Sequence, residues 1–302
     1  MRILITDGMD KTALAQLKAN GHEVVEQFYE PDKLGEALRD FDAVVVRSAT
    51  KVRKEHIDAA KGGKLKLIIR GGVGVDNIDV DYAEANGVTV KNTPRASSDS
   101  VAELALAHMF SVCRFISIAG HTMREDKWEK KAYGGGIEVS GKTLGVIGYG
   151  RIGQSLGKKA MALGMTVLAY DVFKVPGIEC EQMKYVEMDE LLEKSDFISL
   201  HTPSLDGKPL INAETIAKMK DGAVIINTSR GNNVDEAALL DALNSGKLRG
   251  AGLDVYAAEP AKNHELYSHP AVSCTPHIGA ATKEAQKRIG AEIVDIIEAF
   301  AK

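Results

Sequence analysis

The sequence predicts an α/β protein with two doubly wound parallel sheets, and three observations support this fold class. Short apolar strands alternate with helical segments from residue 1 to about residue 92, and a second such round starts at Thr143. A long helical stretch links the two rounds. The second round opens with a glycine-rich turn. Strands that alternate with helices are typical of a parallel sheet with helices on both faces.

The first round contains five strand candidates with helical segments between them. The strands are expected at 3–6, 23–26, 43–47, 66–70 and 88–92, and two of the helices at 12–20 and 54–62. The second round contains six. These strands are expected at 143–148, 166–170, 197–201, 223–229, 250–255 and 272–275, with a helix at 234–246.

Two longer helices complete the expected elements. The link is one helical stretch over about 98–124, and Ser100 with Glu103 three residues later has the pattern of a capping box. The last segment, 283–302, is amphipathic. Its apolar stripe consists of Ile289, Ile293, Ile296, Ile297 and Phe300. This stripe predicts that the last helix packs back on the first round. The sharpest breaks, at 92–98 and 276–282, are the expected hinges.

Length and composition exclude several classes of protein. The chain has 302 residues, enough for one large or two ordinary domains with cores of their own, and its 44% hydrophobic and 26% charged residues are typical of a soluble globular protein. A net charge of −4 without a long basic run predicts no nucleic acid and no membrane as partner. Three distant cysteines, Cys113, Cys180 and Cys274, indicate a reducing compartment and no metal site. We therefore expect a cytoplasmic protein.

The turn that opens the second round has the G-x-G-x-x-G spacing. Within LGVIGYGRIG (144–153), Gly148 permits the tight turn, Gly150 lets the backbone approach a pyrophosphate, and Gly153 allows close packing of helix and strand. The free N–H groups of the following helix attract the anion. Asp171, at the end of the next strand, is placed to accept hydrogen bonds from a ribose and would repel a 2′-phosphate. The motif therefore predicts NAD rather than NADP.

A second glycine cluster, RGGVGVDNID (70–79), also follows a strand but lacks this spacing. It is either a tight turn or a loop whose N–H groups face a small anion. Arg47 and Ser48 follow the neighbouring strand candidate. Ligands of open α/β sheets bind at the carboxyl ends of strands, so both loops are candidates for substrate binding.

Three polar residues follow apolar strands of the second round: Arg230, Glu259 and His277. An arginine can bind a carboxylate through two hydrogen bonds, and a histidine can move a proton at a carbinol oxygen. A glutamate beside that histidine favours the imidazolium form. With NAD, the set predicts hydride transfer from a 2-hydroxy acid. Taken singly, they could be a surface ion-pair partner, a turn carboxylate and a structural histidine.

Three further motifs follow the glycine turn in a fixed order: SRGNNVDEAALLDAL, GAGLDVYAAEP and TPHIGAAT. Together they resemble the D-isomer-specific 2-hydroxyacid dehydrogenases, and the resemblance runs from about residue 40 to residue 282. Within that family, 46–52, 70–79, 92–94 and 126–148 are most similar to the phosphoglycerate dehydrogenase branch. The resemblance implies NAD-dependent oxidation of D-3-phosphoglycerate to 3-phosphohydroxypyruvate in serine biosynthesis.

The resemblance also implies how the domains are divided. A Rossmann NAD-binding domain (98–280) would be inserted into a flavodoxin-like substrate-binding domain (1–97 plus 281–302). Arg230 would bind the substrate carboxylate, His277 would be the acid/base, and Glu259 would orient it. The helix around 98–122 would help to form a homodimer.

The family's remaining positions carry over residue by residue. Arg151 and Ile152 would contact the pyrophosphate, and Asp171 the adenosine ribose. The nicotinamide side would be lined by His201, Thr202, Thr228, Asp254, Gly279 and Ala280. The small-molecule substrate would lie against Arg47, Ser48, Arg70, Gly71 and Gly72, with Arg47 as a candidate phosphate ligand.

This chain departs from the family pattern at three places. Asn232 and Asn233 follow Arg230-Gly231, where the family has a second glycine; asparagine tolerates left-handed backbone, so we expect the loop to persist with a changed shape. Val73 stands where a threonine is common. The chain ends at Lys302, so we expect no regulatory domain and no feedback by serine.

Two other functions stay open. One is a glyoxylate, hydroxypyruvate or other 2-ketoacid reductase of the same family. The other is an NAD-sensing scaffold similar to the corepressors that share this fold, which the complete Arg–Glu–His set disfavours. A cation cluster for a phosphate would favour phosphoglycerate. Arg47 is one candidate, and Lys130 or Lys131 is another, although a solvated charge run explains these lysines equally well.

Overall fold

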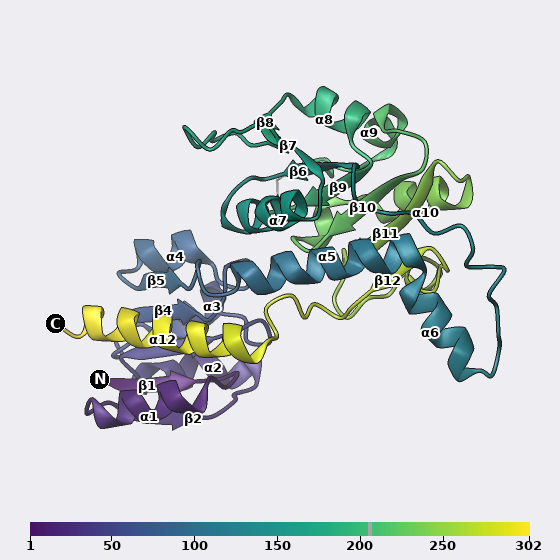
Figure 1. The fold of residues 1–302 in the computed structure, drawn as a ribbon. Helices are drawn as coiled ribbons and strands as arrows, with labels where there is room; N and C mark the ends of the chain where they lie inside the picture. Colours follow the sequence, from purple (N-terminus) through teal and green to yellow (C-terminus); the bar gives the residue numbers. More distant parts are fainter. Residues whose placement is uncertain (205–206) are drawn as a thin grey trace. The chain divides into compact units, whose positions relative to one another are not determined.

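The computed structural model describes residues 1–204 and 207–302, and these divide into two compact units. Unit 1 comprises Met1–Ser98 and Ala280–Lys302, and unit 2 comprises Asp99–Gly279 (Figure 1). Each unit contains one sheet in which every strand pair is parallel. The predicted α/β class with two parallel sheets is therefore confirmed.

The sheet of unit 1 has five strands in the order β2-β1-β3-β4-β5, which is the flavodoxin-like order. Its strands are β1 (Arg2–Ile5), β2 (Glu23–Glu26), β3 (Ala43–Val46), β4 (Leu67–Arg70) and β5 (Thr89–Asn92). Its helices are α1 (Lys11–Ala19), α2 (Pro31–Ala37), η1 (Leu38–Asp40), α3 (Lys54–Ala60), α4 (Val80–Ala85) and α12 (Lys283–Phe300). All five predicted strands are present.

Two buried clusters of unit 1 show that helices cover both faces of its sheet. On one face of the sheet, α2 and α3 pack against β3 and β4. On the opposite face, α1 and α12 pack against the same strands. The stripe on α12 lies in the second cluster, as predicted, although Phe300 at its end stays 37% exposed. A Cβ at Gly290 would lie 2.8 Å from the Ala13 Cβ, so this glycine lets α12 approach α1 closely.

The sheet of unit 2 has seven strands in the order β12-β11-β10-β9-β6-β7-β8. This is the Rossmann order 3-2-1-4-5-6 with one more strand. The strands are β6 (Thr143–Ile147), β7 (Thr166–Tyr170), β8 (Met183–Tyr185), β9 (Phe197–Leu200), β10 (Ala223–Asn227), β11 (Leu248–Leu253) and β12 (Val272–Cys274). Sequence analysis missed β8, which is a three-residue edge strand too short to show a period.

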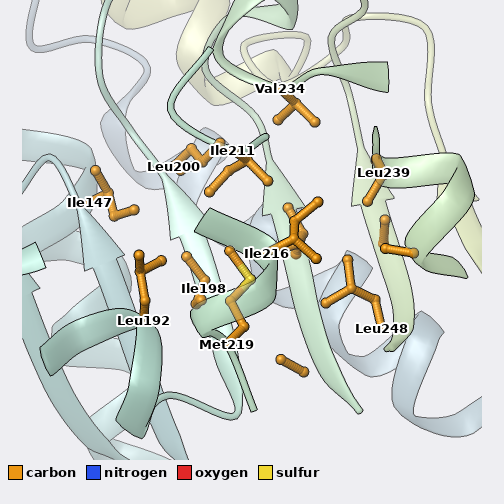
Figure 2. Close-up of a cluster of buried hydrophobic side chains, with 14 of the residues drawn as sticks. Ile147, Leu192, Ile198, Leu200, Ile211, Ile216, Met219, Val234, Leu239 and Leu248 are labelled. Atoms are coloured by element: carbon orange, nitrogen blue, oxygen red, sulfur yellow. The ribbon is translucent and has the colours of Figure 1, made fainter. Parts of the chain in front are cut away.

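Helices also cover both faces of the unit 2 sheet. Figure 2 shows one face, where Leu192, Ile216, Met219 and Leu239 pack on Ile198 and its neighbours. The helices on this side are α8 (Met188–Lys194), α9 (Ala213–Lys218), α10 (Glu236–Asn244) and α11 (His264–Tyr267). The opposite face is covered by α5 (Ser98–Arg114) and α7 (Arg151–Ala162). The last element, η2 (Gly231–Asn233), is a single turn of 3₁₀-helix.

The prediction of one helix over 98–124 is wrong. The stretch forms α5 and a separate α6 (Ile116–Arg124), because Phe115 between them has a left-handed backbone with φ 57°. The capping box at Ser100 is also wrong, since α5 begins at Ser98 and Ser100 lies buried within its first turn. No single helix of the described chain is long and apolar enough to cross a membrane; α5 and α6 meet that criterion only as a pair bent by 67°.

Candidate active site

The glycine turn after β6 has the backbone that the motif predicts. Gly148 has φ 90°, and a Cβ there would lie 2.7 Å from the carbonyl oxygen of His201. A Cβ at Gly153 would lie 2.3 Å from the Gly148 oxygen, so neither position admits a side chain. A Cβ at Gly150 would meet nothing within 4 Å. The turn is therefore tight on its inner side and open at Gly150, where α7 begins and no side chain of the described residues caps its first N–H groups.

Asp171 directly follows β7 and holds this turn in place. Its Oδ2 accepts a hydrogen bond from the Tyr149 N–H at 2.6 Å, and its Oδ1 accepts one from the Phe173 N–H at 2.9 Å. Each carboxylate oxygen has a second lone pair, so the side chain can still accept a hydroxyl donor. This support of the turn was not foreseen from the sequence.

Two buried polar atoms lie at the ends of the central strands β9 and β10. His201 Nε2 is 2.9 Å from Ser199 Oγ, while His201 Nδ1 and Thr228 Oγ1 have no hydrogen-bond partner in the described chain. Burial lowers the pKa of His201 to about 3, so its ring is neutral at neutral pH. A buried unpaired polar atom is costly unless a ligand or water satisfies it.

Hydrogen bonds fix the backbone that carries Arg230. Asn227 Oδ1 accepts from the Ser229 N–H at 3.1 Å and the Ser229 hydroxyl at 2.8 Å, and Asn227 Nδ2 donates to the Arg230 oxygen at 2.9 Å. The Arg230 guanidinium donates to the Ser229 oxygen at 2.7 Å. A Cβ at Gly231 would lie 1.9 Å from the Tyr256 carbonyl, so only glycine fits after the arginine.

The two asparagines after Gly231 do not adopt left-handed backbone, so the reason predicted for the persistence of this loop is wrong. They lie in η2, and neither has a positive φ. Asn233 is 1% exposed, and its Nδ2 donates toward the Thr202 oxygen at 3.1 Å and Ser229 Oγ at 3.1 Å. A buried amide thus joins the loops after β9 and β10. Its residue type alone could not show that it is buried.

His277 and Glu259 form a pair. His277 Nδ1 lies 2.7 Å from Glu259 Oε2, and each side chain is 39% exposed. His277 has φ 52°, and its N–H donates to the Asp254 oxygen at 2.8 Å. Glu259 follows β11 and His277 follows β12, which are neighbouring strands. The pairing leaves His277 Nε2 as the ring nitrogen that can exchange a proton with a substrate.

Asp254, at the end of β11, supports the His277 loop. Its carboxylate is 1% exposed and accepts hydrogen bonds from the Thr275 hydroxyl at 2.6 Å and from the N–H groups of Ile278 and Gly279, both at 2.8 Å. We expected this residue to line the nicotinamide. The contacts that the structure gives it are with the chain itself.

In unit 1, Arg47 has a fixed backbone. Asp7 Oδ2 accepts from the N–H groups of Arg47 at 2.7 Å and Thr50 at 3.0 Å, and Asn77 Nδ2 donates to the oxygens of both residues at 2.7 Å. Ser48 lies between the two residues that these bonds hold, and it is exposed. The bonds join the ends of β1 and β3, where the strand order of this sheet reverses.

The Arg47 side chain lines a cavity of about 430 Å³ with Lys283, Gln286 and Lys287 of α12 and with Asp10. Within 1–204 and 207–302, none of these three cations makes an ion pair. Lys283 and Lys287 were not predicted from the sequence, and the predicted Lys130 and Lys131 lie outside this cavity.

The glycine cluster after β4 has the geometry of a tight turn. The Gly71 N–H donates to the Val46 oxygen and the Gly72 N–H to the Arg70 oxygen, both at 2.9 Å, so neither is open to an anion. Gly72 has φ 150°, and the Arg70 guanidinium occupies the space of its missing Cβ. The exposed Val73 is held through its oxygen by Asn92 Nδ2 at 2.6 Å.

Comparison with known proteins gives a consistent family. Residues 106–279 match the model of the D-isomer specific 2-hydroxyacid dehydrogenase, NAD binding domain. A hydroxypyruvate reductase of Thermotoga maritima is 47% identical over 98% of this chain and 97% of its own length. A D-3-phosphoglycerate dehydrogenase of Methanocaldococcus jannaschii is 43% identical over 99% of this chain but 57% of its own length. The chain thus spans little more than half of such phosphoglycerate dehydrogenases.

Solved structures agree with this. A D-lactate dehydrogenase of Aquifex aeolicus, complexed with NAD and lactic acid, has a TM-score of 0.86 and 32% identity, with 99% of this chain and 95% of that chain covered. A glyoxylate reductase of Paecilomyes thermophila has a TM-score of 0.88 and 32% identity, with coverage of 99% and 94%.

Proposed function

This chain belongs to the D-isomer-specific 2-hydroxyacid dehydrogenase family of NAD-dependent oxidoreductases, and we propose that it oxidises D-3-phosphoglycerate to 3-phosphohydroxypyruvate. The observation that carries the choice of substrate is the cavity of unit 1 with the side chains of Arg47, Lys283 and Lys287. Three cations against one carboxylate, Asp10, suit a phosphate group. The M. jannaschii relative, named for this substrate, supports the same choice.

In this proposal unit 2 is the NAD-binding domain. The open side of Gly150 and the N-terminus of α7 suit a pyrophosphate next to Arg151 and Ile152. Each carboxylate oxygen of Asp171 can accept one more hydrogen bond, from a ribose hydroxyl. His201 Nδ1 and Thr228 Oγ1 are buried polar atoms that make no hydrogen bond within the described residues. Such atoms are expected beside the polar carboxamide of a nicotinamide, which could bond to them. Thr202, Gly279 and Ala280 complete the proposed nicotinamide side.

The reaction needs three actions from the chain. Arg230 binds the substrate carboxylate through its planar guanidinium, which orients C2. His277 Nε2 takes the proton of the C2 hydroxyl, and Glu259, 2.7 Å from Nδ1, stabilises the resulting imidazolium. Bound NAD would supply the hydride acceptor for C2. Arg47 with Ser48, and Arg70 with Gly71 and Gly72, are proposed as further substrate-binding residues.

A second candidate is the reduction of hydroxypyruvate. It is favoured by the T. maritima relative, which matches this chain over almost its whole length and carries that name. The two candidates share the residues of unit 2 and differ in whether the substrate carries a phosphate.

The assay that separates them follows the absorbance of NADH. NADH formation with D-3-phosphoglycerate is compared with NADH consumption with 3-phosphohydroxypyruvate, with hydroxypyruvate and with glyoxylate, at equal enzyme concentration. We expect the largest kcat/KM, taken in each reaction's own direction, for the phosphorylated acid. A kcat/KM for hydroxypyruvate more than tenfold above that for 3-phosphohydroxypyruvate would overturn the choice of substrate.

We also propose that the chain forms a homodimer through the region around α6. None of the α6 residues is buried, and Ile116, Met123 and Trp128 are 57%, 59% and 80% exposed. Exposed apolar side chains at this density mark a contact surface. Light scattering is expected to give twice the chain mass of 32.5 kDa. A monomer at micromolar concentration would contradict the proposal.

A further inference from the structure

A buried histidine that the proposed reaction does not use is joined to the active-site loop. His108 lies on α5 and is 2% exposed. It packs against Gly252, where an added Cβ would lie only 2.4 Å from the His108 Cβ. Its Nδ1 is 2.9 Å from Ser273 Oγ, and its Nε2 is 3.0 Å from Thr275 Oγ1. The glycine on β11 therefore provides the space in which the ring reaches β12 and the residue after it.

The direction of each bond follows from the Asp254 carboxylate. The Thr275 hydroxyl has one hydrogen and donates it to Asp254 Oδ1 at 2.6 Å. Toward His108 the same oxygen can only accept, so His108 Nε2 carries a hydrogen. Burial lowers the pKa of His108, so the ring is neutral, and Nδ1 accepts the hydrogen of Ser273. The bonds thus run in one direction, from Ser273 through His108 and Thr275 to Asp254.

The end of this series bears on the candidate acid/base. Asp254 uses both carboxylate oxygens to hold the N–H groups of Ile278 and Gly279. These two peptides follow His277, whose left-handed backbone is unfavourable for a residue with a Cβ and persists only if its surroundings impose it. The orientation of Asp254 is therefore part of what directs the His277 ring toward Glu259.

We propose that His108 is a positioning residue for His277: by donating from Nε2 to Thr275 Oγ1, it directs the Thr275 hydroxyl onto Asp254 and so fixes the loop of His277. The proposal rests on the proposed function in one respect, namely that His277 is the acid/base. The fixing of the loop itself can be tested without any activity.

The test compares His108→Leu with His108→Gln. Leucine removes the donor, and glutamine keeps an N–H donor and an oxygen acceptor on a flexible side chain. We expect His108→Leu to lower kcat about ten- to hundredfold with little change in KM, because a small misplacement of a catalytic group is costly. We expect His108→Gln to recover most of that loss.

Two matched variants separate positioning from stability. Met109→Ala removes a fully buried side chain next along α5, and Ser273→Ala removes only the partner of Nδ1. Met109→Ala should lower the melting temperature at least as much as His108→Leu and leave kcat at 25 °C unchanged. Ser273→Ala should have a small effect on both.

A readout independent of activity is hydrogen exchange of the amides of Ile278 and Gly279. We expect both to exchange faster in His108→Leu than in the wild type, and at the wild-type rate in Met109→Ala at a temperature far below melting. Unchanged exchange in His108→Leu would overturn the positioning role. Faster exchange with an unchanged kcat would keep that role and instead overturn His277 as the acid/base.

Discussion

The two sheets carry ligand-binding candidates at the same topological place but hold them differently. In unit 1 the strand order reverses between β1 and β3, and there Asp7 accepts the N–H groups of Arg47 and Thr50. In unit 2 it reverses between β9 and β6, and there the glycine turn stays open at Gly150. The first loop is bound through its own backbone, and the second leaves its backbone available to a ligand.

The side chains show the reverse difference. In unit 2 the carboxylates of Asp254, Asp171 and Glu259 are all bonded within the chain, and the His277 ring is paired. In unit 1 the cations of Arg47, Lys283 and Lys287 make no ion pair in the described residues. We infer that unit 2 is built for one reaction, whereas unit 1 selects the substrate through charges that are free to bind it.

This comparison predicts that changes in unit 2 lower kcat or cofactor affinity whatever the substrate. The largest effect is expected for His277→Ala, because the proposed acid/base is lost. Its kcat should fall by a factor on the order of 10²–10⁴. The affinity for NADH, measured by fluorescence titration, should stay nearly unchanged, and full activity would refute the assignment of His277.

The next largest effect is expected for Asp171→Ala. The variant loses the acceptor of the Tyr149 and Phe173 N–H groups and the proposed ligand of the ribose. Loss of hydrogen bonds to a charged acceptor predicts about a tenfold or greater rise in Kd for NAD. Isothermal titration measures it, with the exposed Glu181→Gln as the control. Equal Kd values in both variants would show that Asp171 neither supports the turn nor binds the cofactor.

A further effect is on stability and comes from His201. Its pKa is about 3 in the folded chain, against 6.5 for a free histidine, so below pH 6.5 the unfolded chain binds a proton that the folded chain does not. The resulting stability is fully present above pH 6.5 and falls by about 1.4 kcal/mol per pH unit as the pH decreases toward 3.

Urea denaturation at pH 7, 6 and 5 measures this slope. We expect His201→Gln, which cannot titrate, to lose less stability than the wild type over this range. His108 acts in the same direction and is present in both proteins, so it cancels in the comparison. Parallel curves for the two proteins would contradict the burial of a neutral His201.

The sequence was sufficient where one local pattern determines one structure. Alternating apolar strands and helices predicted both sheets, and the glycine spacing predicted the turn at Gly148 together with the strand that precedes Asp171. The prediction of one helix failed at α5 and α6, because a single residue with left-handed backbone, Phe115, divides a stretch whose helical pattern is continuous. Residue type gives no sign of such a residue unless it is glycine or asparagine.

The candidate site was predictable in its residue types but not in its supports. His277, Glu259 and Arg230 each follow a strand, and such a position can be read from the sequence. Asp254 and Asn233 lie within motifs that the sequence shows, but like His108 they act through burial and through partners that are distant in the sequence, so no motif reveals these supporting contacts. The role of Lys283 and Lys287 could not be predicted, because an amphipathic helix ordinarily exposes its lysines to solvent. Only the fold places these two side chains beside Arg47.

The central claim, that unit 1 selects the substrate through its cations, is tested most directly by the double variant Lys283→Ala/Lys287→Ala. The control is Lys11→Ala/Lys18→Ala, which removes two exposed charges of α1 outside the cavity. The quantity to measure is KM for 3-phosphohydroxypyruvate and for hydroxypyruvate in both variants. We predict a rise of about tenfold or more for the phosphorylated acid alone, from the loss of two charge-assisted contacts. Equal changes for the two acids, or no change, would contradict the claim.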